Sequence, residues 1–277
     1  MHEINIKWVH KKIGEKTMKN KKTLKFYIAI FIAKCASFTL KLLKRNATYM
    51  PGKIALQLCP DFLGMLEKPE TIIGVTGTNG KTTVCNMIND ILTENKYDFI
   101  NNKYGSNIDG GIATTLIQGS TMLGKAKKKL AVLEIDERSA NKIYPYITPT
   151  YLVCTNLFRD SLMRNAHTEF ICDILNKYIP KETIMIENAD DLICSHVAEQ
   201  NKKIYFSIAK LPTDTDHFEN ITRDIIACPK CNSKIEYEYV RYHHIGKAHC
   251  VNCDYKTPEA DLSLIHISEP TRLALIS

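Results

Sequence analysis

The sequence lacks any apolar stretch that could cross a bilayer. Its longest uninterrupted apolar run, residues 26–33, has eight residues, whereas a membrane-spanning helix needs about 20. A lysine-rich leader precedes this run, as in a signal peptide, but no cleavage site of the small-x-small type follows it. We therefore expect neither a transmembrane protein nor an exported one.

Acidic residues are nearly missing from residues 1–50, which hold twelve lysines and arginines against two glutamates. Residues 51–277 carry a net charge of −3, although the whole chain sums to +7. A nucleic-acid binder should be basic over its folded body, so we expect no nucleic-acid partner. Residues 1–50 are predicted to form a basic leader and one helix, residues 23–45. This helix could pack on the body of the protein or rest on anionic lipid headgroups.

The ten cysteines do not form a disulfide framework. Six are scattered singly, which is typical of a reducing cytoplasm. The other four form two Cys-x-x-Cys pairs, Cys228/Cys231 and Cys250/Cys253, separated by eighteen residues. This spacing predicts a structural, tetrahedral Cys₄ zinc site that stabilises a small module at residues 225–258. A redox pair and an iron–sulfur centre are the alternatives.

Glycine is also scarce, at 12 residues in 277, yet three glycines fall within residues 74–80. They lie between an apolar run at residues 71–73 and a segment with helical spacing from Val84. Such a turn can cradle phosphate, because backbone N–H groups approach the oxyanions and the helix N-terminus adds partial positive charge. Lys81 is predicted to reach the β- and γ-phosphates, and the Thr82 hydroxyl to help hold Mg²⁺.

This turn departs from the strict P-loop pattern, which has a glycine where this chain has Val75. A tight turn before an ordinary helix is the alternative, but Gly-Lys-Thr-Thr at a strand-to-helix junction favours a nucleoside triphosphate. The residues expected to contact the nucleotide are Gly77, Thr78, Asn79, Gly80, Lys81, Thr82 and Thr83.

Acidic side chains follow a second predicted strand, residues 130–133. Glu134 is the first of them, and it would lie at the carboxyl end of a parallel strand, where doubly wound sheets bind ligands. A carboxylate there suits Mg²⁺ held beside the phosphates. An exposed acidic turn is the alternative. Lys81 and Glu134 are therefore the candidate catalytic residues, and Thr82 and Glu134 the candidate magnesium ligands.

Strand-like runs, which include residues 151–154 and 183–186, alternate with helical segments at least four times after residue 70, without an internal repeat. This order predicts an α/β fold with a doubly wound, mostly parallel sheet. We expect residues 51–224 to form the nucleotide-binding domain, with the zinc module inserted after it and a tail at residues 259–277. Pro51-Gly52, at the start of this domain, predicts a turn into an ordered segment.

Several segments carry a family resemblance. Residues 77–83, Gly-Thr-Asn-Gly-Lys-Thr-Thr, resemble the ATP loop of the Mur ligase family, whose members join amino acids to cell-wall precursors through acyl phosphates. Pro-Gly-x-Ile-Ala-Leu at residues 51–56 and Thr-Asn-Leu-Phe-Arg-Asp at residues 155–160 are similar to its MurT-type branch. An inserted zinc ribbon also marks that branch. The resemblance covers about residues 26–261.

The resemblance implies roles for individual residues. Glu134 matches the metal-associated glutamate of the family, and Asn188 and Asp191 match a loop on the adenine side of ATP. Beyond residue 160 the pattern weakens, because the acidic positions of the family are Met163 and His167 here.

The resemblance also implies an activity, the ligase half of lipid II isoglutaminyl synthase. ATP would phosphorylate the α-carboxyl of D-glutamate in the lipid II stem peptide, and a GatD-type glutaminase partner would supply ammonia. We expect a cytoplasmic protein that meets lipid II at the inner membrane leaflet. The alternatives are a folylpolyglutamate or muramyl-peptide synthetase and a non-catalytic nucleotide- and zinc-binding module.

The tail matches nothing expected after the zinc ribbon. Residues 262–277 look like a translated adapter sequence, so we expect a fragment whose sheet lacks its last strands. Only 24 residues follow Cys253, too few for the C-terminal domain that Mur-type ligases close over ATP. The chain as written is therefore predicted not to amidate lipid II.

Overall fold

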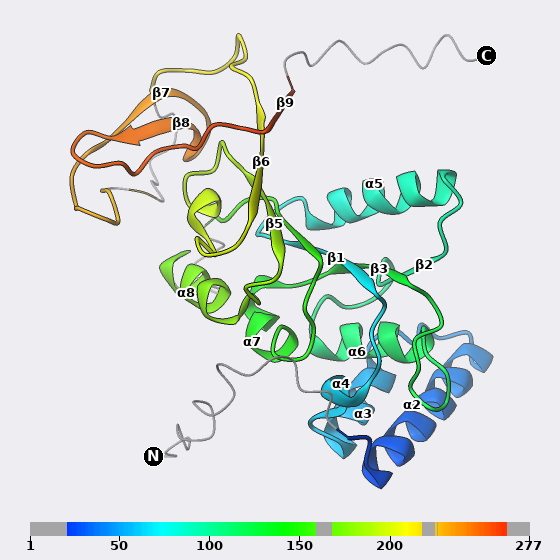
Figure 1. Cartoon of the computed structure of the whole chain (residues 1–277). Coiled ribbons are helices and arrows are strands. Elements are labelled where there is room, and N and C mark those ends of the chain that lie inside the picture. Colours follow the sequence, from blue (N-terminus) through cyan, green and yellow to red (C-terminus); the bar gives the residue numbers. More distant parts are fainter. Residues whose placement is uncertain (1–20, 159–167, 218–224, 226, 265–277) are drawn as a thin grey trace, which may run out of the picture.

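A parallel sheet of seven strands forms the centre of the molecule (Figure 1). The computed structural model describes residues 21–158, 168–217, 225 and 227–264. Every neighbouring pair of strands in this sheet is parallel, which confirms the predicted fold class. In spatial order, the strands are β2 (Phe99–Asn101), β3 (Leu130–Glu134), β1 (Thr71–Thr76), β4 (Tyr151–Cys154), β5 (Ile184–Asn188), β6 (Lys203–Ile208) and β9 (Leu262–Leu264).

Helices cover both faces of the sheet (Figure 1). Alternate side chains of β1 point to opposite faces, so Val75 packs beneath α5 (Lys81–Glu94) while Ile72 joins the main core on the other side. The main core is larger than the cluster beneath α5, and apolar side chains of the other helices belong to it. The helices on this side of the sheet include α6 (Asp109–Gln118), α7 (Ala140–Ile143) and α8 (Thr168–Tyr178). The chain also forms the short 3₁₀ turns η1 (Glu137–Ser139) and η2 (Cys194–His196).

The N-terminal helix α2 (Leu24–Leu42) packs on the body of the protein. Thr23 caps it by accepting a hydrogen bond from the Phe26 amide at 3.3 Å. Phe26 and Ile30 are fully buried against α4 (Phe62–Met65) and its surroundings, and the rings of Phe26 and Phe62 stack. The predicted helix is confirmed, and none of the helices in the described ranges is both long and apolar enough to cross a membrane.

The segment after Pro51 is helical, although Pro-Gly suggested a turn leading into an ordered segment. Pro51 occupies the first turn of α3 (Met50–Leu58), where its missing N–H costs nothing. Gly52 is required by packing, since a Cβ there would lie 2.0 Å from the carbonyl oxygen of Gly110 in α6. Its amide donates to the Thr114 hydroxyl at 2.8 Å. The turn prediction was wrong because the glycine serves a helix–helix contact.

A separate antiparallel hairpin, β7 (Ile235–Tyr242) and β8 (Ile245–Cys250), lies beyond β5 and β6 (Figure 1). Arg241 joins it to the sheet by ion pairs with Asp190 at 3.0 Å and Asp214 at 2.8 Å. His244 adds a third link to the buried carboxylate of Asp191, at 3.0 Å. Arg241 is thus engaged in contacts within the protein.

The start of the tail belongs to the sheet. Residues 262–264 form β9, which pairs with β6 in parallel register. The Asp261 carboxylate leads into it by accepting a hydrogen bond from the Tyr205 amide at 2.7 Å. The expectation that the sheet lacks strands from this region was wrong for these three residues, because a short edge strand needs only a free neighbouring edge. Residues 265–277 lie outside the described part of the chain.

Candidate functional site

The glycine-rich turn is held open by residues at the end of β4. Gly77 and Gly80 have φ angles of +124° and +79°, which side chains rarely allow. Gly77 also lies so close to Thr155 that a Cβ would be 2.4 Å from the threonine hydroxyl. The Asn156 carbonyl accepts a hydrogen bond from the Thr78 amide at 2.8 Å, and its side-chain oxygen accepts one from the Asn79 amide at 2.9 Å. The turn is therefore a preformed loop.

Lys81 lies at the centre of this loop. Its ammonium group donates to the carbonyl oxygens of Gly77 and Thr78, the latter at 3.0 Å. It also forms an ion pair with Glu137 at 3.2 Å, and both side chains are largely buried. Glu137 had no role in the sequence prediction, although it lies in the acidic run that follows β3. The rule that carboxylates gather at the carboxyl ends of parallel strands makes Glu137 one of several candidates, but it does not say which of them turns toward Lys81.

The two predicted magnesium ligands lie together. The Thr82 hydroxyl donates to one oxygen of Glu134 at 2.9 Å, and the Asn107 amide group donates to the other at 3.0 Å. Asn102 fixes the backbone of Glu134 through two hydrogen bonds, of 2.8 and 2.9 Å. A hydroxyl and a carboxylate in contact beside a phosphate loop are oxygen donors of the kind that Mg²⁺ prefers.

Asn188 and Asp191, predicted on the adenine side, lie at the end of β5. The Asp191 carboxylate is completely buried and accepts hydrogen bonds from the amides of Leu157, Ile193 and Cys194. Asn188 donates to the Thr155 carbonyl at 3.2 Å. Both side chains thus fix the loops around the candidate nucleotide site, and a direct contact with the base stays a prediction.

Cys85 lies on α5, close enough to Glu134 for the charge of that carboxylate to affect its thiol. Burial, with a smaller contribution from the negative charge of Glu134, raises the pKa of its thiol to about 12. The thiol therefore stays protonated at neutral pH. It packs with Val75 and Val132 between α5 and the sheet, which is a structural role.

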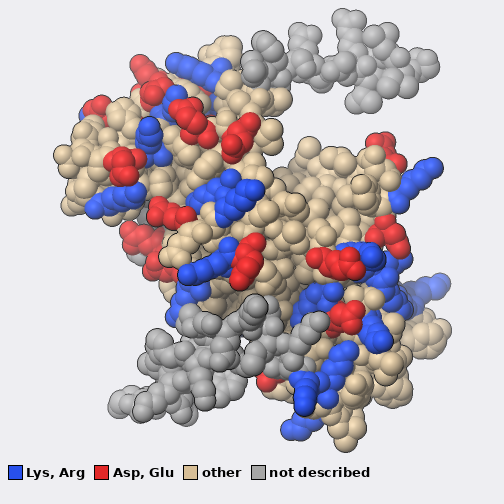
Figure 2. Space-filling view, in the orientation of Figure 1, with Lys and Arg blue, Asp and Glu red and all other residues tan. Residues whose placement is uncertain are grey.

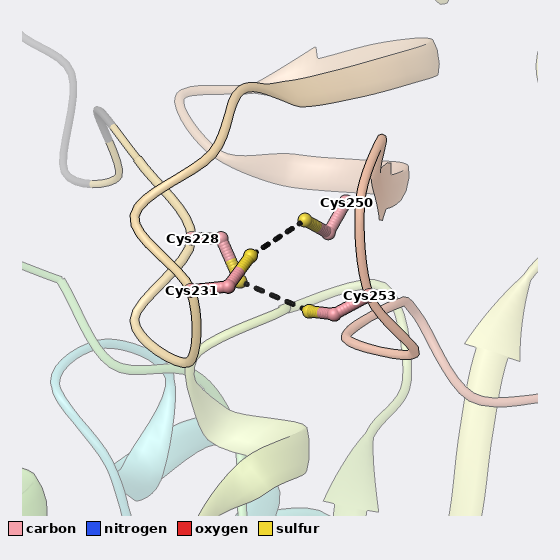
Figure 3. Close-up of side chains that lie close together, drawn as sticks. All are labelled: Cys228, Cys231, Cys250 and Cys253. Atoms are coloured by element: carbon pink, nitrogen blue, oxygen red, sulfur yellow. Dashed lines mark hydrogen bonds between the residues drawn. The ribbon is translucent and has the colours of Figure 1, made fainter.

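The four cysteines of the two Cys-x-x-Cys pairs converge at the base of the hairpin (Figure 3). Their sulfur atoms all lie within 4.8 Å of one another. Cys228 and Cys253 are 3.5 Å apart, and Cys231 and Cys250 are 3.4 Å apart. A tetrahedral Zn²⁺ with Zn–S bonds of about 2.3 Å separates its sulfurs by about 3.8 Å. The donor set and its spacing fit zinc.

A family model for the Mur ligase middle domain matches residues 75–253, from the glycine-rich loop to the last cysteine. The chain belongs to the Mur ligase family. Residues 161–167, where the sequence departs from the MurT-type pattern, lie outside the described part of this Mur ligase chain.

Curated relatives include MurT subunits of glutamine-hydrolysing lipid II isoglutaminyl synthase. The Streptococcus pneumoniae protein is 35% identical over 90% of this chain, and a Staphylococcus aureus protein is 33% identical over 84%. The matches span 55% and 53% of those proteins, so the Mur ligase chain described here covers about half the length of its relatives.

The solved structure of a pseudomurein peptide ligase type C from Methanothermus fervidus has a similar fold. It matches 76% of this chain and 40% of its own with a TM-score of 0.55 and 25% sequence identity. The fold of this chain thus recurs in a peptide ligase.

Proposed function

We propose that the chain is the nucleotide-binding part of an ATP-dependent amide ligase. The observation that carries this proposal is the grouping of Lys81, Thr82 and Glu134 around a preformed glycine loop. A cation, a hydroxyl and a carboxylate at this position provide for phosphates and for the Mg²⁺ that accompanies them. Membership of the Mur ligase family supports the assignment of the nucleotide as ATP.

In this reaction, the protein acts mainly by positioning and by charge. The amides of Thr78 and Asn79 hold the loop against Asn156, which leaves the amides at the N-terminus of α5 for the phosphate chain. Lys81 neutralises charge that develops on the transferred phosphoryl group. Thr82 and Glu134 would hold Mg²⁺, which supplies electrostatic stabilisation when bound. Asn107 and Asn102 keep Glu134 oriented.

The proposed acceptor is the α-carboxyl of D-glutamate in the lipid II stem peptide, which ammonia from a GatD-type glutaminase would convert to the amide. The support is the 33–35% identity to MurT subunits of lipid II isoglutaminyl synthase.

The test of this acceptor uses the protein isolated from its own cells with its co-purifying partners, supplied with lipid II, Mg·ATP and amide-¹⁵N-glutamine. We expect ¹⁵N in the stem peptide and a glutaminase in the preparation. Addition of a whole amino acid to a muramyl peptide or a folate would overturn the proposal.

For the hairpin, we propose a structural zinc ion held by the four cysteines, which leave no coordination position open for catalysis.

We further propose that α2 rests on the inner leaflet of the membrane, which would bring the enzyme to lipid II. Apolar side chains follow one stripe of this helix at intervals of three, four or seven residues, and each is 47–76% exposed. They are Leu24, Ile28, Phe31, Phe38 and Leu42. Lys and Arg side chains gather around this part of the surface (Figure 2), and exposed ones at the ends of α2 include Lys21, Lys25, Lys44 and Arg45. An apolar stripe bordered by positive charge fits anionic lipid.

Vesicle binding tests this contact. The chain should sediment with vesicles that contain phosphatidylglycerol and not with phosphatidylcholine alone. Phe31→Asp with Phe38→Asp should abolish binding, since both residues are exposed and their replacement leaves the core intact. Met87→Asp, at an equally exposed position on α5, is the control. Unchanged sedimentation of the double variant would refute the membrane contact.

A further inference from the structure

The turn of the zinc-binding hairpin lies against the loop that follows β5. Ile245 forms a β-bridge with Asp191, and the Gly246 amide donates to the Asp190 carbonyl at 2.8 Å. This loop is at the carboxyl edge of the sheet, where doubly wound folds bind their ligands. The tip of the hairpin, residues 242–244, is thereby held at the ligand-binding edge.

This placement is rigid because polar contacts fix the hairpin on both sides of its turn. The hydrogen bond between His244 and Asp191 is buried, and Asp191 accepts three backbone hydrogen bonds as well. Arg241 donates to Asp190, Asp214 and the carbonyls of Ile208 and Ala209. Because the hairpin tip is already fixed, a ligand that binds there does not pay the entropy cost of ordering it.

Aromatic side chains connect the hairpin tip with the phosphate loop. The ring of Phe158 lies 5.7 Å from Tyr242, 5.6 Å from His243 and 4.9 Å from His244, between ring centroids. The backbone of Phe158 is bonded to Thr78 of the glycine-rich loop, since its amide donates to the Thr78 hydroxyl at 2.9 Å. The Tyr242 side chain is nonetheless 58% exposed. An aromatic surface that is partly open to solvent thus adjoins the loop.

The direction of a bound nucleotide follows from the sheet order. Glu134 and Thr82 mark the position of Mg²⁺ and the terminal phosphates on the β3 side of β1. The phosphate chain therefore runs toward β4 and β5 on the other side of β1, and the base comes last. Phe158 follows β4, and the hairpin tip lies over the loop after β5. The aromatic surface is on the side where the base must lie.

We propose that the hairpin tip forms one wall of the nucleobase subsite, with Tyr242 stacking against the purine ring of ATP and His243 packed edge-on against Tyr242. This inference rests on the proposed nucleotide function and deepens it, because it gives the zinc module a part in ligand binding. The zinc site would fix the base of the hairpin, and the ion pairs of Arg241 and the hydrogen bond of His244 fix its position on the sheet. The tip is then a specificity element for the base, while the glycine-rich loop binds the phosphates.

The test compares Mg·ATP with inorganic tripolyphosphate, which has the phosphates without the base. Tyr242→Ala should weaken binding of Mg·ATP about tenfold, the usual effect of losing one stacked aromatic ring, and leave tripolyphosphate binding unchanged. Tyr242→Phe should retain the affinity of the wild type for ATP. The control is Tyr97→Ala, at a similarly exposed tyrosine after α5, and retained zinc shows that the hairpin is still folded.

Three results would overturn the nucleobase subsite without overturning the nucleotide site. The first is an unchanged ATP affinity in Tyr242→Ala, and the second is wild-type binding of ATP that is no tighter than binding of tripolyphosphate. The third is equal weakening of the binding of both ligands in Tyr242→Ala with zinc retained, since the tip would then act on the phosphate loop. A wild-type chain that binds neither ligand would overturn the nucleotide site itself, and the inference with it.

Discussion

Glu137 supplies a negative charge to Lys81 at the centre of the glycine-rich loop. The ammonium group is otherwise surrounded by carbonyl oxygens of the loop, and the two charged side chains are 12% and 6% exposed. Removal of one partner from a buried pair leaves the other charge poorly compensated. Glu137 is therefore expected to stabilise the folded protein, in addition to any effect on nucleotide binding.

Glu137→Gln should lower the free energy of unfolding by about 1–3 kcal/mol, because the amide keeps a hydrogen bond but loses the charge. Urea unfolding measures the effect. In a Lys81→Met background the same change should cost much less, which a double-mutant cycle would show as coupling. Equal costs in both backgrounds would mean that Glu137 acts independently of Lys81.

Glu187, on β5, is another of the buried carboxylates. Burial raises its pKa from 4.5 to about 7, against the opposing effect of Lys203, whose ammonium lies 2.9 Å away. The folded state therefore keeps a proton through a range in which the unfolded state has lost it. By linkage, Glu187 contributes a free energy of unfolding that falls as pH rises from 4.5 to about 7.

Glu187→Gln should remove this contribution. The difference in free energy of unfolding between wild type and variant should change across pH 4.5–7, with the wild type losing stability relative to Glu187→Gln as pH rises. Denaturant unfolding at several pH values measures it, and Glu182→Gln, at an exposed glutamate, is the control. A difference that is constant with pH would contradict the shifted pKa.

At the scale of elements, the hairpin with the four-cysteine cluster contacts the sheet through the side chains of Arg241 and His244 and through a bridge to the loop after β5. Its small core around Cys228, Cys250 and Tyr255 also takes in Leu192 of that loop. Asp191 keeps its three backbone hydrogen bonds whether or not His244 is present. We therefore expect the hairpin to unfold without the sheet when its metal is removed.

One zinc per chain should be present, and Cys228→Ser with Cys250→Ser should release it. The hairpin amides should then lose protection in hydrogen exchange, while those of β1, β3 and β4 keep theirs. Elemental analysis gives the metal content, and Cys35→Ser, at an exposed cysteine outside the site, is the control. Zinc retained by the double variant would disprove the assigned ligands.

Elements with a local signal could be predicted from the sequence, and elements that depend on distant partners could not. The apolar runs of β1, β3, β4 and β5 and the helical spacing of α5 are local, so they were predicted. Gly52 looked like part of a turn because its function depends on Gly110, far along the chain. Residues 262–264 carry no strong strand pattern, and only pairing with β6 makes them a strand.

The same distinction holds for the whole candidate site. The contact between Thr82 and Glu134 could be expected, because parallel strands bring their carboxyl ends to one edge. The ion pair of Lys81 with Glu137 could not, since several carboxylates follow β3 and sequence does not say which turns inward. Nor could the link from His244 to Asp191, which joins two units that the sequence separates by 53 positions.

At the scale of the molecule, the account requires one nucleotide site whose affinity depends on Lys81. Calorimetric titration of Mg·ATP into the wild-type chain and Lys81→Ala tests this most directly. We predict one site in the wild type and an affinity at least about tenfold weaker in the variant, a loss of about 1.4 kcal/mol, because Lys81 is the cation within the loop. Equal affinities in the two proteins would contradict the assignment of the glycine-rich loop as the ATP site.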